Sequence, residues 1–214
     1  QTTDWRILNM NKLLNILLFP KSLYGRITSK KSSLYAGILF VGFVDVIFLL
    51  ILNYSSLFTN KMLGDLIFNI ILSVIIMIAF GIIDVCCFSI PMFDLFKHFK
   101  KSDAVKADRE LLIKLMKVYV AVHLIIFPVE LIIFLILYNF PNGNSVFLFY
   151  LLSIVYSLIP IWFSSAITRG ANVLYNFVPP FKWIAFLVIL LWNYLLGYAF
   201  SYMTNNWILE ILRL

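Results

Sequence analysis

Hydrophobic residues along this chain gather into long runs that short polar segments separate. A helix that crosses the hydrocarbon core of a bilayer needs about 20 largely apolar residues in sequence. Five runs are long enough, and they cover about residues 34–53, 66–90, 118–138, 145–168 and 183–204. The pattern predicts an all-α, polytopic membrane protein in which residues 34–214 form a single domain of five transmembrane helices and residues 1–33 form an N-terminal segment.

The composition favours the same class of protein. The 214 residues are 63% hydrophobic and only 13% charged, whereas soluble domains average about half apolar and a quarter charged residues. The net charge of +7 is therefore not a sign of nucleic-acid binding. Basic residues in such a chain mark the cytoplasmic face and its contacts with anionic lipid head groups.

Lysine and arginine are unevenly distributed between the segments that connect the runs. Fifteen of the 17 lie before the first run, between the second and third runs, or between the fourth and fifth runs. Only Lys61 and Arg213 lie in the segments on the alternate side. Cytoplasmic segments carry the excess of lysine and arginine. We therefore predict a multi-pass protein of the cell (plasma) membrane with its N-terminus in the cytoplasm and its C-terminus outside.

Two segments are expected at the cytoplasmic surface. Residues 4–19 place an apolar stripe opposite a polar side, which predicts an amphipathic helix that lies on the inner leaflet or, alternatively, binds a partner protein. Residues 94–117 mix seven basic with four acidic residues, as a solvated and partly helical loop does. We expect Lys97, Lys100 and Lys101 in this loop to form a cytoplasmic docking surface.

Acidic residues interrupt three of the apolar runs, and no run contains a lysine or an arginine. An ionised carboxylate is costly in hydrocarbon, so such a group is protonated, binds a cation or reaches water. Counting about 1.5 Å per residue from the ends of the runs predicts two polar layers. Asp45, Glu130 and Asn193 form a central layer, and Asp84 pairs with His123 in a layer nearer the cytoplasm.

This intramembrane polar layer has two interpretations. In the structural one, protonated carboxyl groups hydrogen-bond between helices and hold the bundle together. In the functional one, the layer binds and moves a proton or another cation, because ionisable residues inside a membrane commonly mark ion pathways. The sequence leaves both interpretations open. Small and polar residues recur at helical spacing on one face of each run, which predicts that the helices pack as one compact bundle. These polar stripes include Asn69, Ser73, Gly81 and Asp84 in the second run, Tyr119, His123 and Glu130 in the third, and Asn193, Gly197, Ser201 and Thr204 in the fifth.

Catalytic motifs are missing from the sequence. With only two histidines, His98 and His123, it has no H-E-x-x-H zinc motif, and it also has no G-x-S-x-G motif and no glycine-rich phosphate loop. We therefore expect a protein that is not an enzyme and that needs neither a cofactor nor a metal ion.

Short motifs in the chain resemble those of a known family. Leu18-Phe19-Pro20 is followed by Leu23-Tyr24-Gly25 just before the first run, and the third run contains Tyr119 and Pro128. In these features the chain is similar to the YIP-domain family, membrane proteins that interact with Ypt/Rab GTPases, and to its bacterial-type members. The resemblance implies five spans, a cytoplasmic N-terminus and a non-enzymatic protein that acts through membrane partners.

Two functions are therefore expected. The first is a scaffold or accessory partner of another membrane complex, such as an ABC exporter, which binds a membrane-protein partner or a second copy of itself. The alternative is a small proton- or cation-coupled transporter or channel that uses the polar layer around Asp45 and Glu130.

Overall fold

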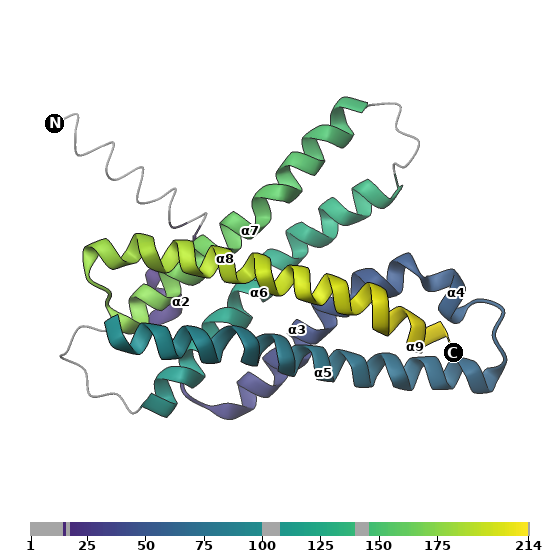
Figure 1. Cartoon of the computed structure of the whole chain (residues 1–214), viewed down its shortest axis with the longest axis horizontal. Helices are drawn as coiled ribbons and strands as arrows, with labels where there is room; N and C mark the ends of the chain where they lie inside the picture. The colour runs from purple at the N-terminus through teal and green to yellow at the C-terminus, as the bar shows by residue number, and fades with distance from the viewer. Residues whose placement is uncertain (1–14, 16–17, 100–107, 140–145, 214) are drawn as a thin grey trace.

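Helices make up all regular secondary structure in the described part of the chain. The computed structural model describes residue 15 and residues 18–99, 108–139 and 146–213 (Figure 1). Its long helices are α3 (Lys31–Leu52), α5 (Leu63–Phe96), α6 (Asp108–Asn139), α7 (Val146–Tyr175) and α8 (Pro179–Met203). These five helices are long and apolar enough to cross a membrane, which confirms the predicted all-α, multi-pass architecture. The amphipathic helix predicted over residues 4–19 lies almost entirely outside the described residues.

Short helices lie at the two ends of the bundle. They are α2 (Lys21–Gly25), α4 (Tyr54–Phe58), the 3-10 turn η1 (Lys97–Phe99), the π-helical turn η2 (Thr204–Ile208) and α9 (Leu209–Arg213). We call the two ends the α2 end, where α2 packs against α7, and the α4 end, where α4 packs against α9. Away from the α2 end, α6 and α7 diverge from α3, α5 and α8 (Figure 1).

Helices α3 and α5 touch through their backbones at two glycines. A Cβ atom added to Gly42 would overlap the carbonyl oxygen of Met77 and would lie 2.8 Å from the backbone nitrogen of Gly81. Small residues allow helices to approach this closely in a membrane. Because Gly42 and Gly81 each precede an aspartate by three residues, the crossing fixes the positions of Asp45 and Asp84.

A tryptophan joins α8 to α5 at a proline. Pro91 lies inside α5 and has no N–H to donate, so the carbonyl of Cys87, four residues earlier, loses its usual helical partner. The indole Nε1–H of Trp192 in α8 donates a hydrogen bond to this carbonyl at 3.0 Å. This bond gives the Cys87 carbonyl a donor that lipid cannot supply, and it links α8 to α5.

The connection between α7 and α8 is short and sharply turned. Asn176, directly after α7, has a φ of 49°, a left-handed conformation that asparagine tolerates better than most residues. Pro179 and Pro180 then begin α8, where a proline needs no hydrogen-bond acceptor. The resulting hairpin places Asn193 of α8 beside Ser164 of α7, and the Asn193 Nδ2 donates to the Ser164 Oγ at 2.9 Å.

The polar stripe predicted for the second span faces the interior of the bundle. All four of its members are buried, namely Asn69, Ser73, Gly81 and Asp84. The side chain of Asn69 donates to the carbonyl of Leu57 in α4 at 2.7 Å. The stripe predicted for the fifth span is less buried, because Gly197 and Ser201 of α8 are exposed and line cavities instead.

Candidate functional site

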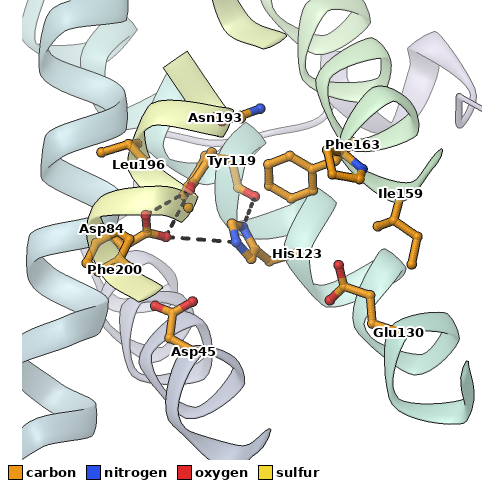
Figure 2. Close-up of a pocket in the computed structure, with 12 residues that line it drawn as sticks. Asp45, Asp84, Tyr119, His123, Glu130, Ile159, Phe163, Asn193, Leu196 and Phe200 are labelled. Atoms are coloured by element: carbon orange, nitrogen blue, oxygen red, sulfur yellow. Dashed lines mark hydrogen bonds and ion pairs between the residues drawn. The ribbon is translucent and has the colours of Figure 1, made fainter. Parts of the chain in front are cut away.

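One cavity in the middle of the bundle brings together the polar residues that the sequence singled out. Its volume is about 240 Å³, and helices α3, α5, α6, α7 and α8 all contribute to its wall. The predicted residues that line it are Asp45, Asp84, His123, Glu130 and Asn193. Figure 2 shows these side chains around the cavity, which we call the central cavity.

Asp84 of α5 and His123 of α6 lie next to each other in the wall of the central cavity. The distance from the His123 Nε2 to the Asp84 Oδ2 is 3.8 Å, so the two residues that we predict to pair lie next to each other. This distance is longer than a hydrogen bond. The two groups are therefore adjacent, with a narrow gap between the nitrogen and the carboxylate.

Tyr119 holds the Asp84 carboxylate in place. Its hydroxyl donates to Asp84 and lies 3.0 Å from Oδ1 and 2.9 Å from Oδ2. The ring of Tyr119 stacks on Phe88 of α5 with centroids 4.1 Å apart, and Phe163 of α7 meets it edge-on. Packing on both sides leaves the hydroxyl little freedom to move away from Asp84. The sequence marked Tyr119 as a polar residue of its span but gave no sign of this bond.

The hydrogen bonds of His123 indicate which ring nitrogen carries the proton. The Nδ1 lies 3.2 Å from the backbone carbonyl oxygen of Tyr119, which can only accept, so we assign the proton to Nδ1. In the neutral ring the Nε2 then has a free lone pair, and this is the nitrogen that faces Asp84. Phe163 packs edge-on against the imidazole, with ring centroids 4.6 Å apart.

Asp45 of α3 completes a cluster of three ligand-bearing side chains. One ligand atom from each of Asp45, Asp84 and His123 can be chosen so that all three lie within 4.8 Å of one another. The Oδ2 atom of Asp45 is buried and has no hydrogen-bond partner. We call these three residues the Asp-Asp-His cluster.

The depth count predicted a layer of Asp45 with Glu130 and Asn193, whereas in the structure the carboxylate of Asp45 lies within 4.8 Å of ligand atoms of Asp84 and His123. The depth count ignored the direction of the side chains. In a helix each Cα–Cβ bond leans towards the N-terminus, and α3 and α5 run in opposite directions. The two aspartates therefore lean towards each other from opposite sides of the Gly42–Gly81 crossing.

Glu130 and Asn193 line the same cavity at some distance from this cluster. In Figure 2 the Glu130 carboxylate lies across the cavity from Asp45, on the same helix as His123. Asn193 uses its amide to reach Ser164. The structure therefore makes Glu130 a second acidic group of the cavity wall and makes Asn193 a contact between helices.

A second cavity, of about 260 Å³, lies next to the first on the side of the α4 end. Asp45 and Phe200 line both cavities. The second cavity continues past Asn53 of α3 and past Ser201 and Thr204 near the end of α8. Asp45 thus stands between the central cavity and a partly polar space that leads towards one end of the bundle.

Comparison of the chain with family models, with curated proteins and with solved structures gives no match. The resemblance to the YIP-domain family stays a prediction, and the Asp-Asp-His cluster is interpreted from its own chemistry.

The predicted docking surface is only partly within the described residues. Lys97 is exposed, its Nζ lies 2.7 Å from the Oδ1 of Asp94, and it also lies over the ring of Phe93. Exposed ion pairs of this kind add little to stability. Lys100 and Lys101 lie outside the described residues.

Proposed function

We propose that this protein is a small cation transporter or channel and that the Asp-Asp-His cluster is its cation-binding site. The observation that carries the proposal is the convergence of Asp45, Asp84 and His123 on one cavity between apolar helices. Among the described residues that line the two cavities, His123 is the only basic one. A cation supplies the positive charge that two neighbouring carboxylates lack in such surroundings.

The two cavities support transport over a purely structural role for the acids. If the acids only joined helices, the Asp45 carboxyl group would be expected to hydrogen-bond to a neighbouring helix, yet its buried Oδ2 has no such partner. Asp45 instead lines both cavities. We expect a cation that leaves the cluster towards the α4 end to pass through the second cavity.

The finer features of the predicted topology belong to the same proposal. The protein lies in the plasma membrane, and the positive-inside rule places its N-terminus in the cytoplasm. The α4 end then faces outwards, and the second cavity leads from the cluster to that face. The role of scaffold for another membrane complex remains the alternative, and it rests on the family resemblance alone.

Flux through reconstituted liposomes tests the proposal. Purified protein in liposomes is assayed with indicators for protons, for monovalent cations and for divalent metal ions. We expect cation flux above that of empty liposomes, and we expect Asp45→Asn to abolish it. Asp65→Asn is the matched control, because Asp65 is an exposed acid in the first turn of α5. Wild-type flux equal to that of empty liposomes for every cation would overturn the proposal.

A further inference from the structure

We infer that the ion bound by the Asp-Asp-His cluster is a divalent first-row transition metal ion such as Zn²⁺, Mn²⁺ or Co²⁺. Its ligands are the His123 Nε2 and one carboxylate oxygen each from Asp45 and Asp84. The inference rests on the proposed function, since it names the class of cation for the same site.

The chemistry of the three ligands selects this class of ion. Sodium, potassium, magnesium and calcium ions are held by oxygen ligands, whereas an imidazole nitrogen together with carboxylates suits zinc and its neighbours in the first transition row. The site is more than a group of acids, because His123 of a third helix, α6, adds a nitrogen ligand. Two carboxylates also balance the double charge of the metal ion.

The spacing of the ligand atoms fits such an ion after a small adjustment. Ligand atoms around tetrahedral zinc, at bond lengths near 2.0–2.1 Å, lie about 3.3 Å from one another. In the structure the His123 Nε2 is 3.8 Å from the Asp84 Oδ2, and all three ligand atoms lie within 4.8 Å. Rotations of the side chains, with no movement of the helices, are enough to close distances of this size.

Neighbouring groups already orient two of the three ligands. A metal-binding histidine usually donates its other N–H to a carbonyl or carboxylate, which fixes the tautomer. The His123 Nδ1 makes such a contact with the Tyr119 carbonyl. The Tyr119 hydroxyl lies at similar distances from both oxygens of Asp84, so each oxygen keeps a lone pair for a metal ion. Tyr119 is therefore a positioning residue.

The number of ligands suits an ion that must enter and leave. Structural zinc sites are closed by four protein ligands, whereas three protein ligands leave a position for water or another group. The three side chains line the central cavity, and Glu130 lines the opposite wall. Glu130 is placed to receive an ion that has left the cluster.

The expectation of no metal ion came from motif spacing within single segments. Here the ligands come from three helices and are separated by 39 residues in each interval, from Asp45 to Asp84 and from Asp84 to His123. Zinc motifs place pairs of ligands a few residues apart, so the sequence carried no such signal.

Metal titration of the purified protein tests the inference. The protein is stripped with a chelator in detergent micelles and titrated with Co²⁺, whose visible absorption reports coordination by nitrogen and oxygen. We expect one Co²⁺ per chain, displaced by Zn²⁺. Asp84→Asn and His123→Gln should each weaken binding at least 100-fold, while Asp65→Asn should keep it. Size-exclusion elution shows whether each variant is folded.

A milder variant keeps the test decisive if those substitutions prevent folding. Tyr119→Phe keeps the ring between Phe88 and Phe163 and removes only the hydroxyl. Loss of a group that orients a ligand usually costs 10- to 100-fold in metal affinity, so we expect a loss of this size with one Co²⁺ per chain retained. Unchanged affinity in Tyr119→Phe would contradict the ligand role of Asp84.

The two proposals fail in different ways. Cation flux in liposomes without binding of Co²⁺ or Zn²⁺ overturns the metal assignment and leaves the transporter in place. Stoichiometric metal binding without flux supports the metal site and overturns transport. Absence of both overturns both proposals.

Discussion

Replacing Gly81 by alanine tests whether the close crossing of α3 and α5 holds the bundle together. The added Cβ would overlap the carbonyl oxygen of Ile38, and it would lie 2.8 Å from the backbone nitrogen of Gly42 and 3.1 Å from its Cα. All of these atoms belong to backbone, which cannot rotate out of the way as a flexible side chain can. The two helices must therefore move apart.

The expected loss of stability follows from two opposing effects. Overpacking a well-packed site costs about 1–3 kcal/mol, and contact with backbone favours the upper end, near about 3 kcal/mol. Alanine in a helix interior is favoured over glycine by about 1 kcal/mol. We therefore expect Gly81→Ala to lower the free energy of unfolding by about 2 kcal/mol.

Titration with SDS from mixed micelles, followed by tryptophan fluorescence, measures this free energy. The matched control is Gly197→Ala, because Gly197 also lies inside a long helix but has nothing within 4 Å of an added Cβ. The control should be neutral or up to about 1 kcal/mol more stable than wild type. Equal stability of Gly81→Ala and Gly197→Ala would refute the idea that backbone contact holds α3 against α5.

The same titration checks three further contacts. Trp192→Phe should cost about 1 kcal/mol, because the Cys87 carbonyl loses its donor, and unchanged stability would mean that this bond contributes nothing. Asn69→Ala should cost about 2 kcal/mol, because the Leu57 carbonyl loses the amide that donates to it. A loss of stability smaller than that of Trp192→Phe would mean that this hydrogen bond contributes little. Tyr24→Ala should cost about 3–5 kcal/mol, because the side chain is 1% exposed, whereas Tyr24→Phe, which keeps the ring, should cost under about 1 kcal/mol.

Features that depend on one helix at a time were predictable from the sequence. The spans follow from run length, and the acids stood out because a carboxylate inside an apolar run is costly. The three acids selected on this basis line the central cavity, as do His123 and Asn193, which the depth count placed beside them. The burial of Asn69 and Ser73 also follows from the period of the helix, since both lie on the face that carries Asp84.

Features that depend on how helices meet were not predictable in the same way. The grouping of Asp45 with Asp84 depends on the lean of side chains in two antiparallel helices. The bond from Tyr119 to Asp84 and the bond from Trp192 to Cys87 each join residues that no spacing rule connects. The short helix α4 was also missed, because five residues are too few to show a period.

The origin of the three ligands has a consequence for assembly. Asp45, Asp84 and His123 belong to α3, α5 and α6, so an ion bound to all three acts as a removable cross-link between separate helices. In a bilayer no hydrophobic force drives helices together, and a ligand that binds only the assembled state stabilises it by mass action. At a concentration 100 times its dissociation constant, the ion adds about 2.7 kcal/mol. Loss of the ion would loosen the bundle at its centre.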